Sequence, residues 1–224
     1  MGKIVAGFGV PHSPNIPEAV RKDGQNHPVV PLYARVAAAI EAARPDVLII
    51  FDCDHFSTFF LDHLPIFAVG VDDRTAGPND GTVMPRYQVP VHRALAECLR
   101  ARGIAAGFDL SLVQDFEIDH SIMVPLHFLT PKMTIPIIPV FINCFVPPLP
   151  SARRCHALGQ AVRAAVESFP QPLRVAPVAS GRAFPIRHGW SGLAASCRPA
   201  ASTPCWRRQR RNACCRPGTS LPSC

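Results

Sequence analysis

The sequence predicts an α/β fold, a three-layer α/β/α sandwich in which helices cover both faces of a central sheet. Three observations support this prediction. Residues 136–142 (PIIPVFI) form a short, β-branched apolar run that is typical of a buried strand. Residues 152–168 follow with Ala, Leu, Val and Arg in the order of an amphipathic helix. The chain of 224 residues is long enough for one domain with a substantial core, and strands that alternate with helices favour such layers.

The first half of the chain is expected to contain three strands and one helix. Residues 3–10 are apolar, and we interpret them as a first strand rather than a signal peptide because the apolar stretch is short and has no basic segment of any length before it. Residues 31–43 have helical spacing and end before Pro45. Residues 46–52 (DVLIIFD) and 66–71 are short apolar runs of the kind that form buried strands.

Besides the strand over residues 136–142 and the helix over residues 152–168, the second half is expected to contain one more helix and two more strands. Residues 91–102 have the spacing of a helix, which Gly103 is expected to end. Residues 104–109 are expected to form a weak strand. Residues 175–179 are expected to form the strand that follows the amphipathic helix.

Composition changes after Gly181, and we expect a domain over residues 1–181 and an unrelated, disordered tail over residues 182–224. The tail has eight arginines and no acid, and Arg, Cys, Pro, Ser and Ala dominate it. This composition is typical of a GC-rich gene read out of frame. Back-translated and shifted by one base, residues 182–187 can read Gly-Leu-Ser-His-Ser. We therefore expect a frameshift and a truncated domain, and the alternative is a natural basic tail.

Charge and cysteine distribution disfavour several classes of protein. The net charge of +7 comes from the tail, since residues 1–181 hold 15 basic against 16 acidic residues, so no nucleic-acid partner is expected. No apolar run is long enough for a membrane span. Before the tail there is no CxxC pair, which favours a reduced, cytoplasmic protein. The cysteines there are Cys53, Cys98, Cys144 and Cys155, and those of the tail are Cys197, Cys205, Cys214, Cys215 and Cys224.

Two histidines follow predicted strands, where the active sites of α/β proteins gather. His12 follows the first strand between prolines, and His55 follows the strand over residues 46–52 together with Asp52 and Asp54. A neutral imidazole binds Fe, Zn, Cu or Ni, and a carboxylate commonly accepts the other N–H of such a histidine. Asp52 and Asp54 are candidates for that supporting role. The alternatives are a structural histidine and an aspartate that caps a turn.

A third histidine, His120, has Asp119 beside it and an apolar Val-Pro-Leu run after it. This pattern suits an acid/base histidine on a loop, or another metal ligand. His127 is expected to face elsewhere. From the residues alone we predict a mononuclear metal enzyme with two histidines and one carboxylate; Fe(II) oxygen chemistry is favoured, and zinc hydrolysis is the alternative. Four other histidines are expected on the surface or in packing: His27, His63, His92 and His156.

Five ordered blocks make the chain resemble the class III (LigB-type) extradiol ring-cleavage dioxygenases, including the protocatechuate 4,5-dioxygenase β subunit and the dihydroxyphenylpropionate dioxygenases. They cover residues 1 to about 181. The blocks are PHSPNIP, PDVLIIFDCDHFSTFFLDHLPIFAVGV, the IDH-then-PL segment at Ile118 to Leu126, IPVFINCFVPPLP and RCHALGQAVRAAVESFP.

The resemblance implies a mixed central sheet and a site for Fe(2+). In that family two histidines and one glutamate hold the iron, which makes His12 and His55 the expected metal ligands. His120 is the expected acid/base residue, with Asp119 as a further supporting carboxylate. The implied reaction opens a catechol ring with O2. A small α subunit or a second copy of the chain is the implied partner.

The chain departs from the family pattern after Gly181. The family continues Ser-Gly-Gly-Leu/Met-Ser-His, whose histidine is a second acid/base residue, and its ligand glutamate lies farther on. Here no acid follows Glu167, so the third metal ligand is unknown. The chain is therefore expected to be inactive or nearly so. The alternative function is that of a non-catalytic, metal-binding or subunit-interaction relative.

Overall fold

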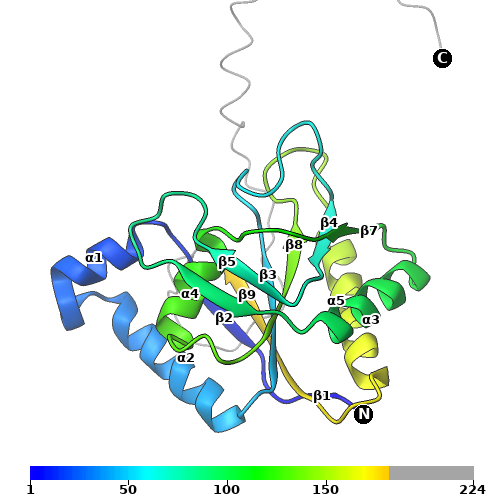
Figure 1. Cartoon of the computed structure of the whole chain (residues 1–224), viewed down its shortest axis with the longest axis horizontal. Helices are drawn as coiled ribbons and strands as arrows, with labels where there is room; N and C mark the ends of the chain where they lie inside the picture. Colours follow the sequence, from blue (N-terminus) through cyan, green and yellow to red (C-terminus); the bar gives the residue numbers. More distant parts are fainter. Residues whose placement is uncertain (182–224) are drawn as a thin grey trace, which may run out of the picture. The chain divides into compact units, whose positions relative to one another are not determined.

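Apolar strands from across the sequence pair into one mixed sheet in the computed structural model, which describes residues 1–181 (Figure 1). Neighbouring strands are parallel except β4 and β8. The predicted sandwich with a mixed sheet is thus confirmed. Its order is β1 (Lys3–Ile4), β9 (Arg174–Gly181), β3 (Val47–Asp52), β8 (Ile137–Ile142), β4 (Phe67–Gly70) and β7 (Leu110–Val113), and β2 (Phe8–Pro11) also pairs with β9.

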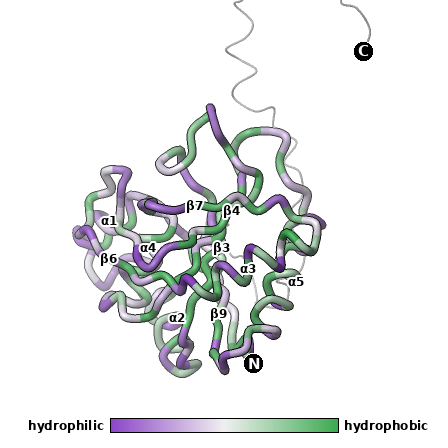
Figure 2. The backbone as a smooth tube through the Cα atoms, turned by 45° about the vertical axis from the view of Figure 1, so that its right-hand side comes forward, coloured by the Kyte–Doolittle hydropathy of each residue, from purple (hydrophilic) through white to green (hydrophobic). Residues whose placement is uncertain are grey.

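Side chains of the central strands alternate between two cores. In β3, Leu48 and Ile50 face one core and Val47 and Ile49 face the other, and all four are buried. Figure 2 shows β3 as hydrophobic, whereas α3 alternates in hydropathy. Helix α2 (Val29–Ala43) packs with α4 (His120–Leu129), and α3 (Arg93–Ala105) packs with α5 (Ala152–Ser168). Each pair covers one face, because the residues of α2 and α4 line the first core and those of α3 and α5 line the second.

The first predicted strand is interrupted. Residues 3–10 form β1 and β2, which pair with the same strand, β9, at Lys3↔Arg174 and Phe8↔Val178. The sequence pattern did not distinguish this broken edge from one continuous strand.

The predicted strand over residues 104–109 is wrong. Helix α3 continues to Ala105, and β7 begins only at Leu110. Gly103 does not end the helix. It lies inside α3 against Leu110, where a Cβ atom would be 2.3 Å from Leu110 Cδ1. This glycine therefore allows close packing of the helix on the strand rather than a stop.

Several elements were not predicted. They are α1 (Ile16–Asp23), the short 3₁₀ helix at Gly24–Asn26, α4, and the hairpin of β5 (Arg74–Gly77) and β6 (Tyr87–Pro90). No helix within residues 1–181 is long and apolar enough to cross a membrane. The predictions for residues 182–224 lie outside the residues that the structure describes.

Candidate metal centre

The carboxyl ends of β2 and β3, which both run parallel to β9, bring His12 and His55 to one edge of the sheet. Pro11 pairs with Gly181 and Phe51 with Ala179, so the residues after β2 and β3 emerge beside the end of β9. The ring centroids of the two histidines are 5.1 Å apart.

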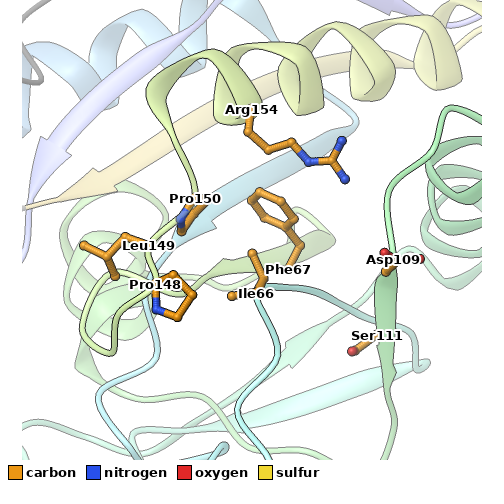
Figure 3. A pocket seen from close by; sticks show the side chains of 8 residues that line it. All are labelled: Ile66, Phe67, Asp109, Ser111, Pro148, Leu149, Pro150 and Arg154. Atoms are coloured by element: carbon orange, nitrogen blue, oxygen red, sulfur yellow. The ribbon is translucent and has the colours of Figure 1, made fainter. Parts of the chain in front are cut away.

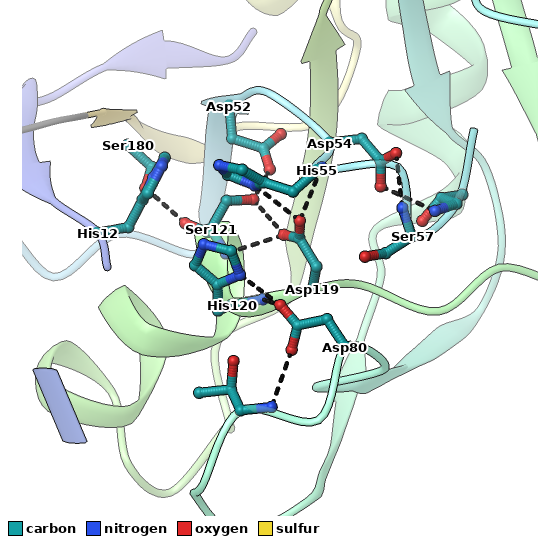
Figure 4. A network of polar contacts seen from close by, with 12 residues as sticks. His12, Asp52, Asp54, His55, Ser57, Asp80, Asp119, His120, Ser121 and Ser180 are labelled. Atoms are coloured by element: carbon teal, nitrogen blue, oxygen red, sulfur yellow. Dashed lines mark hydrogen bonds and ion pairs between the residues drawn. The ribbon is translucent and has the colours of Figure 1, made fainter. Parts of the chain in front are cut away.

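His120 joins them from the first turn of α4. Its ring centroid lies 4.3 Å from that of His55 and 5.6 Å from that of His12 (Figure 4). One nitrogen from each of the three rings lies within 4.8 Å of the other two. The three histidines singled out in the sequence therefore form one cluster. His127 instead contacts the hydroxyl of Tyr87, as expected for a residue that faces elsewhere.

The hydrogen bonds of His12 fix which of its nitrogens carries the proton. Ser180 Oγ donates to the carbonyl oxygen of Ser121, which can only accept. The hydroxyl has no second proton, so His12 Nδ1 must donate to Ser180 Oγ, at 2.9 Å. The Nε2 lone pair is then free for a metal. Burial, and next the charges of His55 and His120, lower the pKa of His12 to about 4, so the ring is neutral at neutral pH.

His55 is held by a single carboxylate oxygen. Asp119 Oδ2 accepts from the backbone N–H of His55 and from its Nδ1, both at 2.9 Å. This arrangement again leaves Nε2 without a proton in the neutral ring. Burial opposes protonation, but the hydrogen bond and charge of Asp119 outweigh it and raise the pKa of His55.

His120 is held in the same way by Asp80, from the loop between β5 and β6. Asp80 Oδ2 accepts from the His120 backbone N–H at 3.1 Å and from Nδ1. Burial opposes the ionised form of Asp80, yet the bonds from His120 lower its pKa. Asp80 was missed in the sequence, where it lies 40 positions before His120. The prediction of a loop at His120 was also wrong, because His120 is the first residue of α4 and Asp119 is its N-cap.

Two buried carboxylates share one hydroxyl beneath the histidines. Ser121 Oγ contacts both Asp52 Oδ2 and Asp119 Oδ1, although it has one proton to donate (Figure 4). Burial, reinforced by the charges of Asp119 and Asp54, raises the pKa of Asp52 well above its usual value. Burial therefore favours the protonated form of Asp52, in which its O–H donates to Ser121 and Ser121 donates to the ionised Asp119.

The three predicted supporting aspartates thus have different positions. Asp119 contacts His55 directly, whereas Asp52 contacts Ser121, which in turn contacts Asp119. Asp54 accepts from the backbone N–H groups of the turn that follows His55, which is the turn-capping alternative considered for it. The donors are Ser57, Thr58 and Phe59.

Aromatic and thiol groups lie beside His55. The ring of Phe145 is 5.1 Å from that of His55, between centroids. The thiols of Cys53 and Cys144 hydrogen-bond each other, which raises the pKa of Cys53 and lowers that of Cys144 to about 7.

A surface depression elsewhere contains none of the clustered histidines (Figure 3). It lies where β4 and β7 approach the loop before α5, and Arg154, which stacks on Phe108, closes one side. Its lining offers no cluster of metal-binding groups, so we place the chemistry at the histidines. The lining residues are Ile66, Phe67, Asp109, Ser111, Pro148, Leu149, Pro150 and Arg154.

The histidine cluster fits a divalent transition metal. Three imidazoles have their Nδ1 positions engaged, and one nitrogen of each ring lies within 4.8 Å of the other two, a donor set that suits Fe, Zn, Cu or Ni. Within residues 1–181 no carboxylate joins all three nitrogens; Asp80 and Asp119 group with His120 on its other side.

Comparison with known proteins points to one family. Residues 6–184 match the family model described as the catalytic LigB subunit of aromatic ring-opening dioxygenase. Similar curated proteins are named 2,3-dihydroxyphenylpropionate/2,3-dihydroxicinnamic acid 1,2-dioxygenase. That of Pseudomonas putida is 34% identical over 126 residues, which are 56% of this chain and 39% of the relative.

Two further relatives carry the same enzyme name. The protein from Mycobacterium ulcerans is 34% identical over 154 residues, 67% of this chain and 48% of its own. The protein from Escherichia coli K12 is 35% identical over 132 residues, which are 58% of this chain and 41% of the relative. The matched segment thus spans between about two fifths and one half of these relatives' length.

Proposed function

Because the chain belongs to the LigB family of catalytic subunits of aromatic ring-opening dioxygenases, we propose that it carries part of an extradiol site that opens a catechol ring with O2. The observation that supports this most directly is the convergence of three oriented imidazoles at the ends of β2 and β3. The family match covers the elements that contribute all three.

We propose His12 and His55 as the ligands of an Fe(2+) ion. Both rings are held through Nδ1 by a partner that accepts its proton, the usual arrangement for metal-bound histidine. Iron in such a setting would supply an electron pathway between catechol and dioxygen. Burial keeps His12 neutral, so its nitrogen needs no deprotonation before it binds.

His120 is the proposed acid/base residue. The Nε2 atom of the neutral ring can accept a proton from a catechol hydroxyl and later return it to the opened product. Asp80 contacts the opposite nitrogen, so it orients the ring and stabilises the positive charge that appears after proton uptake. His120 is 8% exposed at its side chain, which keeps bulk water from competing for this proton.

The proposed substrates are catechols that carry an acidic side group. The names of the relatives suggest 2,3-dihydroxyphenylpropionate, and the resemblance of the RCHALGQAVRAAVESFP block suggests protocatechuate. Rates of ring opening measured with each of the two catechols decide which is the better substrate.

We further propose that residues 1–181 form an incomplete catalytic domain and that residues 182–224 are unrelated to it. The family match ends at residue 184, close to the change of composition after Gly181. The third ligand and the second acid/base histidine have no counterpart among the described residues. Resequencing the gene around codon 182 tests the frameshift: a one-base correction should open a frame with Gly-Leu-Ser-His and a later glutamate. A confirmed sequence with no such frame would contradict it.

A second candidate function is metal binding without catalysis. It is favoured by the lack of a carboxylate ligand among the three histidine nitrogens of residues 1–181. Under this proposal the chain would bind a divalent ion, or pair with another subunit, without consuming O2.

One experiment separates the two functions. The protein is loaded with Fe(II) under anaerobic conditions, and bound iron, O2 uptake and the yellow ring-opened product are measured with each catechol. His12→Ala and His55→Ala should lose iron, whereas His120→Ala should keep iron and lose turnover. His156→Ala, on the exposed side of α5, is the matched control. Iron binding without O2 uptake in the parent protein would favour the second function. Unchanged iron binding in both His12→Ala and His55→Ala would contradict the first function and favour the second.

A further inference from the structure

Two cysteines lie at the ends of neighbouring strands beside the histidine cluster. Strands β3 and β8 run parallel with Asp52 opposite Phe141. Cys53 is the residue directly after β3, and Cys144 follows the end of β8 by two residues. The two thiols contact each other through a hydrogen bond, although 90 residues separate them in the sequence.

The pair is open to reagents from solution. Cys144 is exposed and Cys53 is partly exposed. In thiol–disulfide exchange the external disulfide must reach at least one cysteine sulfur, and the exposed sulfur of Cys144 can be reached. Because the partner thiol is already in contact, a mixed disulfide formed at Cys144 can be displaced by Cys53 without a search through the chain.

We propose that Cys53 and Cys144 form a reversible dithiol–disulfide pair at the edge of the metal centre. Oxidised glutathione is the proposed oxidant. One cysteine thiolate attacks its S–S bond and releases one glutathione thiolate; the second cysteine thiolate then attacks the mixed disulfide and releases the other. Overall, two cysteine thiols lose two electrons and two protons, and one oxidised glutathione becomes two reduced molecules.

The bond would lie close to a proposed metal ligand. Cys53 precedes His55 by two residues, and Cys144 directly precedes Phe145, whose ring contacts that of His55. A disulfide would therefore tie together the two segments that flank His55. The thiol redox state of the surroundings would thus determine whether the segments beside the metal centre are covalently linked. This holds whether or not the chain turns over a catechol.

The test follows the cross-link itself, so it does not depend on enzyme activity. The full chain is equilibrated without O2 in glutathione buffers from fully reduced to fully oxidised, free thiols are alkylated, and the protein is digested with trypsin. Cys53 and Cys144 each fall alone in a peptide, residues 36–74 and 133–153. We expect a cross-linked species with the summed mass of both peptides less two hydrogens. It should disappear when reduced glutathione is restored.

Single variants provide the controls. In Cys53→Ser and Cys144→Ser the cross-linked species should be absent, and the remaining cysteine should be recovered alkylated or bound to glutathione. Cys53→Ala provides the same test if the serine variant folds poorly. Two alkylated peptides at the oxidised end of the series would overturn the proposal. So would a cross-link that joins either cysteine to another one in preference to its neighbour.

Discussion

Asp119 fixes His55 through one oxygen atom: its Oδ2 accepts both the backbone N–H and the ring Nδ1 of that histidine, each at 2.9 Å. Asp80 repeats the arrangement on His120. Two bonds to the same oxygen couple the ring to its own main chain, so rotation of the side chain breaks one of them. In each case the second ring nitrogen is left without a carboxylate partner, which makes the aspartates positioning residues for the proposed metal centre.

Asp119→Asn should weaken metal binding by about 10- to 100-fold, the usual effect of removing a carboxylate behind a metal-bound histidine. The asparagine keeps the N-cap of α4, so the helix should remain folded. Zinc and cobalt affinities, measured by competition with a chromophoric chelator, test this. Glu117→Gln, two residues away in a surface ion pair with Arg86, is the matched control and should bind as the parent does. Equal affinities in both variants would contradict the role of Asp119.

Asp52→Asn should not destabilise the protein at neutral pH and should raise its melting temperature. Because burial raises the pKa of Asp52 in the folded state, unfolding above pH 3.8 releases its proton. A raised folded pKa means that stability from this group is present below pH 3.8 and is lost as pH rises. The asparagine N–H can replace the O–H that donates to Ser121, and it removes this pH dependence.

Thermal melts between pH 3 and pH 8 measure this difference. The advantage of Asp52→Asn over the parent should grow with pH and vanish at the acid end. Asp52→Ala is the comparison, because it leaves Ser121 without its buried donor and should cost about 1–3 kcal/mol. A loss in Asp52→Asn as large as that in Asp52→Ala would show that Asp52 is ionised in the fold.

The sequence allowed prediction of the buried strands and of the residues that follow them. The short apolar runs of β3 and β8 are typical of buried strands. Parallel pairing of the strands then placed His12 and His55 at one edge of the sheet. Helix α4 was missed for a physical reason. Residues 120–126 are all buried, so the helix has no polar face to produce a periodic pattern, and Pro125 within it argues against a helix.

The partner of His120 could not be predicted because it depends on tertiary structure. Asp80 lies in a polar turn between two short strands, and nothing local relates that turn to a histidine forty residues later. The packing of the β5–β6 hairpin against the segment before α4, which includes the Ile118 N–H bond to the Ala76 carbonyl, brings them together. Local patterns give strand ends, whereas the orientation of the side chains there depends on such contacts.

Asp80→Ala should free the His120 ring and mix its two neutral tautomers. In the parent, the contact of Nδ1 with Asp80 holds the neutral ring in the tautomer whose proton is on Nδ1. Nuclear magnetic resonance of protein labelled with ¹⁵N-histidine distinguishes the two nitrogens by their chemical shifts. Asp73→Ala, which removes a surface contact with Arg93, is the control and should leave the His120 signals unchanged. An unchanged tautomer in Asp80→Ala would contradict the positioning role.

Gly77→Ala should destabilise the fold and weaken metal binding together. A Cβ atom at Gly77 would lie 2.3 Å from the backbone oxygen of Ile118, and no side-chain rotation can relieve that clash. The hairpin must then move away from the segment that leads to Asp119 and His120. We expect a loss of about 1–3 kcal/mol in urea unfolding, as for other overpacked sites, and a lower zinc affinity. Gly159→Ala is the matched control, since a Cβ in the middle of α5 meets nothing within 4 Å and should stabilise the helix by about 0.5–1 kcal/mol. If Gly77→Ala lost stability but bound zinc as tightly as the parent, the hairpin would hold Asp80 independently of its contact with Ile118.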